Sequence, residues 1–163
     1  MGIDATVGGA SANSYVTALE AETYFETRFD SGSWTDATDG NKSGSLLGAT
    51  GLLEQREYIG TAVDTTQILQ WPRSGVQKRT GFQLESTTAI PQRVKNATYE
   101  LAFALIEGTI DLSPANDAFT GNLKVGPISL PPRIRNAKTK WPQIVTKELR
   151  GLLLNSDVGT VRA

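Results

Sequence analysis

The stretch from Ile90 to Gly108 constrains the fold most, because it holds the start, body and end of one apolar helix. Pro91 suits the first helical turn, where its missing N–H leaves no hydrogen bond unmade, and Gly108 suits the left-handed residue past the end. Between them apolar residues recur at three- and four-residue intervals, and Phe103 and Ile106 widen the stripe. We therefore expect this helix to be covered on more than one side, at the centre of the fold. Its principal inward residues are Val94, Ala97, Leu101, Ala104 and Leu105.

The length of 163 residues allows one domain with a substantial core and is short for two domains of ordinary size. A hydrophobic fraction of 39% and a charged fraction of 20% are typical of a soluble globular protein. We find no apolar run near the roughly 18 residues that cross a membrane and no signal peptide, so we expect a cytosolic chain without a membrane partner. Because the chain contains no Cys and no His, it lacks disulfides, thiolate metal ligands and the commonest general base.

Charge is distributed unevenly along the chain. Residues 1–64 hold 3 Lys/Arg against 10 Asp/Glu, residues 65–123 hold 5 against 5, and residues 124–163 hold 8 against 2. An acidic front and a basic tail suit a protein whose ends meet the opposite end of a neighbouring copy, or a polyanion. The alternative is a pair of solvated faces with no partner.

Two helices are expected before the central one. Thr17 and Glu20 form a capping box, in which each side chain satisfies a backbone donor of the first turn, and the helix continues to about Phe29. A second helix is expected over residues 42–59. Its glycines each weaken it by roughly 1 kcal/mol relative to Ala, unless close helix packing requires the missing side chains. These glycines are Gly44, Gly48 and Gly51.

The segment before the central helix contains a Trp-Pro pair. Trp71 must be extended, because the ring of Pro72 disfavours helical geometry in the preceding residue. A large ring in an extended segment is either a core side chain or an interface anchor, and the usual burial of tryptophan favours the core. Residues 77–89 are expected to form a loop or a short hairpin that leads to the central helix.

The last third is predicted to contain a β element and a final helix. Leu123 and Val125 precede Gly126 and Pro127, and apolar residues follow them, which favours a short strand pair or an extended arm. A basic run comes next, and Pro142 opens the final helix. The apolar stripe of that helix consists of Val145, Leu149, Leu152 and Leu153.

The sequence thus predicts a mainly α fold. We expect a bundle of about four helices with a small β-hairpin or extended arm and a C-terminal helix. Residues 1–14 are rich in Gly, Ala, Ser and Asn, and we expect a flexible segment there. Residues 15–130 would form the helical core, and residues 131–163 would form a basic arm and helix.

The chain offers few groups for chemistry. Its carboxylate pairs lie on polar helix faces, and Gly48 to Gly51 lacks the lysine of a phosphate loop. We therefore expect neither an enzyme nor a cofactor. The eight cations of the basic tail could contact phosphates without sequence preference, and stacking on Trp141 could add roughly 1–3 kcal/mol per base. Sparse aromatic residues there argue against a specific single-strand binder.

Several segments, in this order, resemble a family of tailed-phage proteins. The most specific are residues 70–76, Gln-Trp-Pro-Arg-Ser-Gly-Val, and residues 90–95, Ile-Pro-Gln-Arg-Val-Lys. The resemblance extends over residues 13–108. The chain is similar to proteins labelled DnaT-like single-stranded-DNA-binding proteins, which share their size and helical pattern with head-tail adaptor, or head-completion, proteins. The other matching pieces are residues 14–17, Glu22, Tyr24, Phe25, Trp34, the second helix and residues 100–102.

The resemblance implies a structural virion protein that is assembled in the host cytoplasm. It would form a ring, of 12 subunits in such adaptors, below the portal, would bind the next tail component, and would surround packaged DNA. The implied portal-docking residues are Trp141, Ile144, Val145, Leu149, Leu152 and Leu153. The implied subunit contact consists of Trp71, Pro72 and Arg73. The residues implied to approach DNA or portal acids are Arg133, Arg135, Lys138 and Lys140. The alternative function is non-specific binding of single-stranded DNA.

Overall fold

The computed structural model describes residues 2–110, 123–125, 128–130 and 141–154. This part of the chain is mainly helical, as predicted, and contains two small antiparallel sheets. None of the helices found in these ranges has the length and apolar character needed to span a bilayer. The helices are α1 (Ala18–Thr27), α2 (Gly32–Thr35), α3 (Asp39–Glu54), α4 (Gln92–Ile106) and α5 (Gln143–Leu149).

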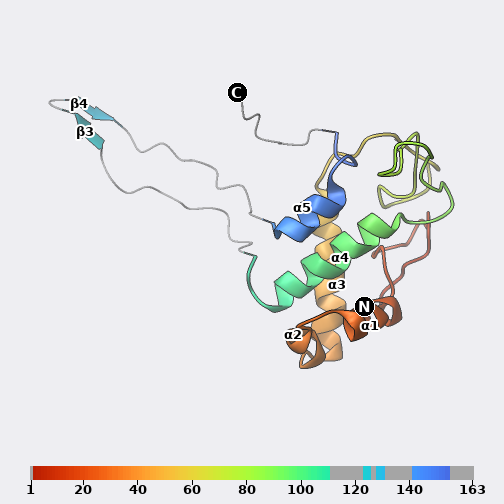
Figure 1. Cartoon of the computed structure of the whole chain (residues 1–163), viewed down its shortest axis with the longest axis horizontal. Coiled ribbons are helices and arrows are strands. Elements are labelled where there is room, and N and C mark those ends of the chain that lie inside the picture. Colours follow the sequence, from red (N-terminus) through yellow and green to blue (C-terminus); the bar gives the residue numbers. More distant parts are fainter. Residues whose placement is uncertain (1, 111–122, 126–127, 131–140, 155–163) are drawn as a thin grey trace.

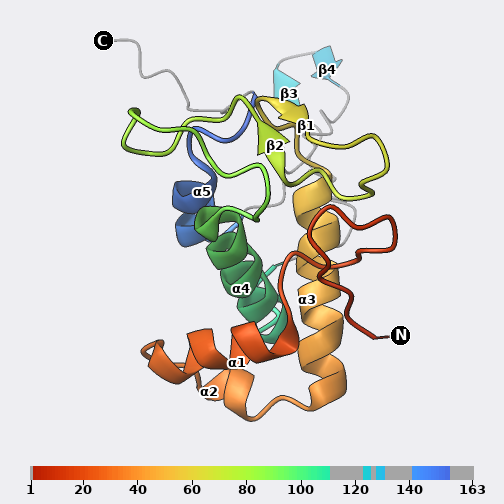
Figure 2. The same cartoon turned by 90° about the vertical axis from the view of Figure 1, so that its right-hand side faces the viewer.

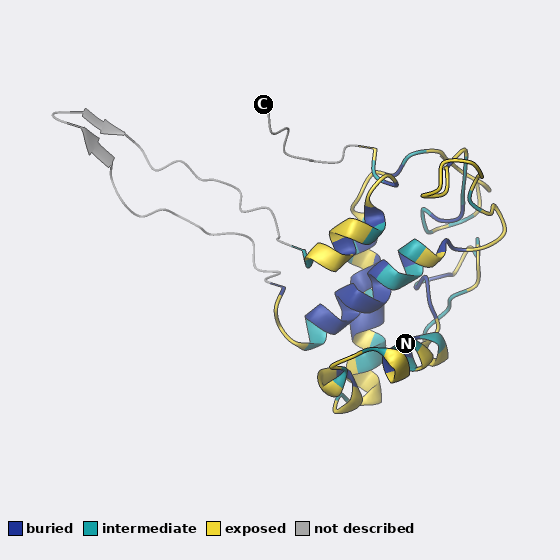
Figure 3. Cartoon of the chain, in the orientation of Figure 1, coloured by how far each residue is buried: buried dark blue, intermediate teal, exposed yellow. Residues whose placement is uncertain are grey.

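Helix α4 lies between α3 and α5 and packs against both (Figures 1 and 2). Its buried residues run from Val94 to Ala104, and Figure 3 shows the middle of the helix buried. Pro91 stands just before the first turn, and Gly108 follows the last with φ +66°. The N–H of Thr109 donates to the carbonyl of Ala104 at 3.0 Å, which closes the helix end. The predicted central helix is therefore confirmed.

Helices α1 and α2 cover one end of α4. The predicted capping box is present: the N–H of Glu20 donates to Thr17 Oγ1 at 3.2 Å, and the N–H of Thr17 donates to Glu20 Oε2 at 2.8 Å. In α2, the buried ring of Trp34 stacks on Phe25 with 4.2 Å between centroids. Aromatic stacking therefore fixes the short α2 against α1.

Helix α3 ends at Glu54, so the predicted extension to Ile59 was wrong. Beyond the helix, the chain pairs instead with the segment that follows α5. The N–H of Ile59 donates to the carbonyl of Leu152, and the N–H of Leu154 donates to that of Glu57, each at 2.9 Å. This pairing satisfies the backbone groups that a longer helix would have used.

One of the three glycines of α3 serves close packing against α4. A β-carbon built at Gly48 would lie 3.3 Å from Leu105 Cδ1, which is tighter than an ordinary contact. A β-carbon at Gly44 or Gly51 would meet nothing within 4 Å. The missing side chain is therefore needed at Gly48, and the other two glycines carry the helix-propensity cost without a packing gain.

Each sheet contains two strands. The pair β3 (Leu123–Val125) and β4 (Ile128–Leu130) matches the predicted strand pair and is antiparallel, with Leu123 opposite Leu130. The pair β1 (Thr61–Ala62) and β2 (Arg73–Ser74) was not predicted. It holds the extended Trp-Pro segment beside the chain that leaves α3.

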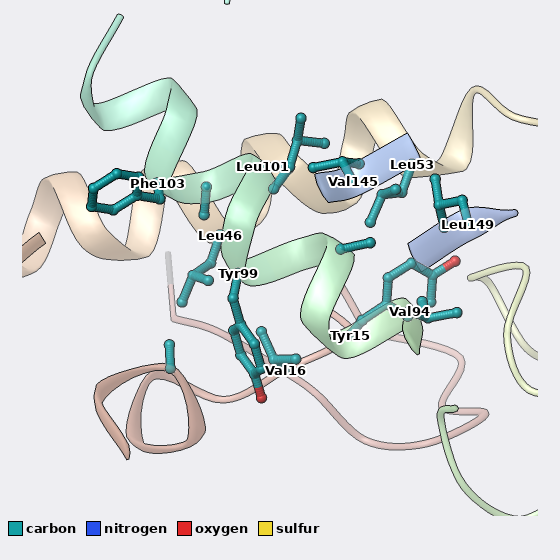
Figure 4. Packing of buried hydrophobic residues seen from close by; sticks show 14 of the residues in the cluster. Tyr15, Val16, Leu46, Leu53, Val94, Tyr99, Leu101, Phe103, Val145 and Leu149 are labelled. Carbon is teal, nitrogen blue, oxygen red and sulfur yellow. The ribbon is translucent and has the colours of Figure 1, made fainter. Parts of the chain in front are cut away.

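The core joins α3, α4, α5 and the segment before α1, as Figure 4 shows. Leu46 and Leu53 come from α3, and Val145 and Leu149 come from α5. All four have 0% exposed area, and they enclose the buried face of α4. Burial of a side chain of this size stabilises a fold by roughly 1.5–3 kcal/mol, so α5 is an integral part of this core.

Two polar networks lie within or beside this core. Glu100, 4% exposed on α4, accepts hydrogen bonds from Tyr24 Oη at 2.7 Å and from Arg28 Nε at 2.9 Å. The hydrogen bond to Glu100 raises the pKa of Arg28, against the opposing effect of its burial. In the second network, the half-buried Glu54 accepts a hydrogen bond from Tyr15 Oη. Burial, followed by the charge of Glu54, raises the pKa of Tyr15.

Residues 2–14 form a loop around Asp4. The carbonyl of Asp4 accepts the N–H of Asn13 at 2.8 Å, and the N–H of Asp4 donates to Asn13 Oδ1 at 2.7 Å. The side chain of Asp4 accepts hydrogen bonds from Thr6 and Ser11. The flexibility expected for residues 1–14 remains a prediction.

Candidate nucleic-acid interface

An open groove of about 840 Å³ lies between the loop over residues 75–84, the start of α4 and the end of α5. Five cationic side chains line it, and we call it the basic groove. Its remaining lining includes Ile59, Leu84 and three glycines. The cations are Lys78, Arg79, Arg93, Lys147 and Arg150.

A hairpin over residues 76–85 forms one wall of the basic groove. Gln77 pairs with Leu84, the N–H of Glu85 donates to the carbonyl of Val76 at 2.8 Å, and the N–H of Lys78 donates to that of Gln83 at 2.7 Å. This confirms the shorter structure expected for residues 77–89. Gly81 turns the chain at the tip with φ +76°, a conformation that glycine adopts without strain.

Arg93, at the start of α4, joins the walls of the groove. It is paired with Glu85 of the hairpin at 3.0 Å, and both side chains are largely buried. It also donates at 3.3 Å to the carbonyls of Gln77 and Arg150. One guanidinium thus connects α4 to the hairpin and to the residue after α5.

Arg79 connects the hairpin to α5 from the other side. Its Nη2 donates to the carbonyl of Lys147 at 2.7 Å, in the last turn of α5, where carbonyls lack helical partners. It also lies 3.9 Å from Glu148, and its side chain remains 59% exposed. Arg79 can therefore hold α5 and still offer charge to a ligand.

The other three cations of the groove, Lys78, Lys147 and Arg150, are exposed. Two carboxylates lie beside the groove, Glu85 and Glu148, so five cations leave an excess of three positive charges. A surface of this kind attracts an extended polyanion by contacts to its phosphates. Its residues have neither the nucleophiles nor the acid–base pairs of a catalytic site.

The structure places the residues implied for portal docking mainly inside the chain. Val145, Leu149 and Leu152 have 0% exposed area, because they pack against the core. Leu153 is half-buried, and Ile144 is 43% exposed. Trp141 is also half-buried, with the guanidinium of Arg56 at 4.1 Å from its ring centroid. Their docking to a portal remains a prediction.

The residues implied for a subunit contact also have roles within the chain. Trp71 and Pro72 are buried, and Trp71 meets Tyr58 edge to face, which is the core alternative that the sequence left open. Arg73 donates to the carbonyls of Ile59 and Gly60 at 2.8 and 2.6 Å. Contact with a neighbouring subunit remains a prediction. The basic residues Arg133, Arg135, Lys138 and Lys140 lie outside the described residues.

Sequence reasoning did not predict the basic groove, because its cations come from three separate segments. The signal that could have indicated it is the Lys78-Arg79 pair at the tip of an expected hairpin. Metal binding has no comparable candidate: the described part of the chain holds no group of three or more carboxylates that could bind an ion.

Comparison with known proteins places the whole chain in one family. The sequence profile of the family described as "Putative DnaT-like ssDNA binding protein" matches residues 1–163. The chain belongs to this family. The searches of curated proteins and of solved structures found no significant match.

The DnaT-like family match covers more of the chain than the resemblance predicted from sequence, which ended at residue 108. It therefore includes both segments that line the basic groove, the hairpin and α5. The comparisons give no support to the head-tail adaptor identity that the resemblance also implied.

Proposed function

We propose that this protein binds single-stranded DNA through its phosphates, without sequence preference, in the basic groove. The observation that carries the proposal is the convergence of cations on one open groove from the hairpin, α4 and the end of α5. The family description, which names single-stranded DNA, supports the choice of polyanion. Phosphate contacts carry no sequence information, so the binding is non-specific.

The proposal predicts a defined dependence on salt. If the four most accessible cations each neutralise one phosphate, log K falls against log salt with a slope of about −3, because each contact to a single strand contributes about −0.7. Fluorescence anisotropy of a labelled oligothymidylate, titrated with protein at several salt concentrations, measures this slope. Binding that does not respond to salt would contradict the proposal.

Charge-removing variants locate the interaction. Lys78→Ala and Lys147→Ala remove exposed cations from the hairpin and from α5, and neither side chain holds the fold together. Each should weaken binding and make the slope shallower by about 0.7. Arg56→Ala, an exposed cation outside the groove, is the matched control and should leave the slope unchanged. Equal effects of all three variants would place the interaction elsewhere.

A ring-forming adaptor below a phage portal is the second candidate. The observation that favours it is a separation of charge: acidic residues gather around α1 and α2, at the end of the molecule away from the hairpin and the basic groove (Figure 1). Such a molecule can associate head to tail. Light scattering of the protein, alone and with portal protein, tests this candidate. A ring or a stoichiometric complex supports it, and a monomer that ignores the portal contradicts it. The acidic residues are Glu22, Glu26, Asp30, Asp36 and Asp39.

A further inference from the structure

Phe82 is exposed at the tip of the hairpin that forms one wall of the basic groove. Its side chain is 95% exposed, while the residues on either side in the turn, Gly81 and Leu84, line the groove. A phenylalanine left in water forgoes roughly 1.5–3 kcal/mol of burial free energy. Folding of the chain does not explain its position.

The hairpin backbone holds this ring in place. Below the tip, Lys78 and Gln83 are joined by a backbone hydrogen bond of 2.7 Å and by a second one between their side chains at 3.3 Å. The N–H of Gly81 donates to the carbonyl of Lys78 at 2.8 Å and tightens the turn. An aromatic ring on a hydrogen-bonded turn loses little conformational freedom when a ligand stacks on it.

Cations and an aromatic ring side by side match the chemistry of a single strand. Lys78 and Arg79 lie on the same turn as Phe82, and the cations of α5 lie across the groove. Phosphate contacts alone do not distinguish a single strand from a duplex. A ring can stack only on a base that has left the duplex stack, and any base offers such a face.

We infer that Phe82 stacks on a base of the strand whose phosphates occupy the basic groove, and that this contact selects single-stranded over double-stranded nucleic acid. The inference rests on the proposed function. Phe82 acts here as a binding and specificity residue, while the cations supply attraction without selectivity.

Phe29 provides a matched control. It is 96% exposed, in the connection between α1 and α2, and its neighbour Asp30 is acidic. Among the described residues, Phe29 and Phe82 are the two aromatic side chains that the fold leaves exposed. They share residue type and exposure and differ in the charge of their surroundings, so Phe29→Ala should leave binding unchanged.

The experiment compares three ligands of similar charge by fluorescence anisotropy at one low salt concentration. The ligands are an oligothymidylate, an abasic strand with the same number of phosphates, and a duplex. Phe82→Ala should bind the oligothymidylate about tenfold more weakly than the wild type, since loss of one stacked base has this order of effect. It should bind the abasic strand within about twofold, because the phosphate contacts remain.

Two further readouts separate stacking from a structural effect. Phe82→Trp should restore the affinity for the oligothymidylate, and the salt slope of Phe82→Ala should equal that of the wild type, because stacking releases no counterions. If Phe82→Ala binds the oligothymidylate like the wild type while Lys147→Ala does not, the inference is overturned and the groove stands. If the wild type binds neither strand at low salt, the proposed function and the inference are both overturned.

Discussion

Arg93 and Glu85 form an ion pair at the base of the basic groove, with Nη2 3.0 Å from Oε1 and both side chains largely buried. The pair joins the first turn of α4 to the returning strand of the hairpin. Since Arg93 also donates to the carbonyl of Arg150, it fixes the residue after α5 as well. The groove therefore depends on a cation that is itself mostly withdrawn from solvent.

Replacement of this cation should destabilise the protein measurably. Arg93→Met leaves the carboxylate of Glu85 without its partner, and should lower the free energy of unfolding by about 2 kcal/mol, below the range for fully buried pairs because some exposure remains. Urea unfolding followed by circular dichroism measures the change. Arg79→Met, at a side chain that is 59% exposed, is the control and should cost less than about 1 kcal/mol. Equal losses would show that the Arg93 pair has no special role.

The Arg28–Glu100 pair should be the most costly ion pair to break among those described here. Glu100 is 4% exposed, and Arg28 also covers the ring of Phe103 at 3.9 Å from its centroid. Arg28→Met should lower the free energy of unfolding by about 3 kcal/mol, because it leaves a buried carboxylate with Tyr24 as its remaining donor. Lys42→Met breaks the more exposed pair with Glu22 and should cost about 1 kcal/mol or less. A ranking in the opposite order in thermal or urea unfolding would contradict this assignment.

Two glycines with the same backbone angle should respond differently to alanine. Gly60 and Gly75 both have φ +77°, so a side chain is strained at either position. A β-carbon at Gly60 would lie 2.3 Å from the carbonyl oxygen of Ser74, whereas the nearest atom at Gly75 is 4.0 Å away. Gly75→Ala should cost about 1–2 kcal/mol, and Gly60→Ala should cost more, because the β1–β2 pair must also separate. Similar unfolding midpoints for the two variants would disprove the close approach.

The contribution of Glu20 to stability should disappear in acid. Its burial alone would raise its pKa, but hydrogen bonds from Lys95 and Thr17 outweigh this effect, so its pKa lies below the ordinary value of 4.5. A carboxyl group with a lowered pKa stabilises the fold above its unfolded pKa and loses this effect as the pH falls through its folded pKa. Glu20→Gln should therefore be less stable than the wild type by about 1 kcal/mol at about pH 7.

Near about pH 2.5, the wild type and Glu20→Gln should unfold at the same urea concentration, because the carboxyl of the wild type is then protonated. The capping box alone gives no reason for a different result, since Thr17 retains its bond to the first turn in both proteins. A stability difference that is constant from about pH 7 to about pH 2.5 would show that the charge of Glu20 does not contribute.

Local signals in the sequence sufficed for several helices. Pro91 and Gly108 bracket α4, and Thr17 with Glu20 begins α1, because each signal acts within one or two turns of backbone. The end of α3 could not be predicted in this way. It is set by pairing with the segment around Leu152, almost a hundred residues away, and long-range pairing leaves no mark in local periodicity.

The candidate site was even less accessible to sequence reasoning. Counting charge along the chain directs attention to the tail, where cations are dense in sequence. The groove instead gathers Lys78 and Arg79 with Lys147 and Arg150, nearly seventy residues apart, because the hairpin and α5 pack at the same end of α4. The amphipathic stripe of α5 was likewise recognised, but its partner is the core of the same chain.

Hydrogen–deuterium exchange with and without a single-stranded oligonucleotide tests the central claim most directly, because it reports which backbone segments the ligand protects. The account predicts protection of peptides that cover residues 75–85 and 143–151, with little change over α1 and α2. Protection confined to residues 131–140, or absent from the hairpin and α5 at saturating oligonucleotide, would contradict the basic groove as the binding site.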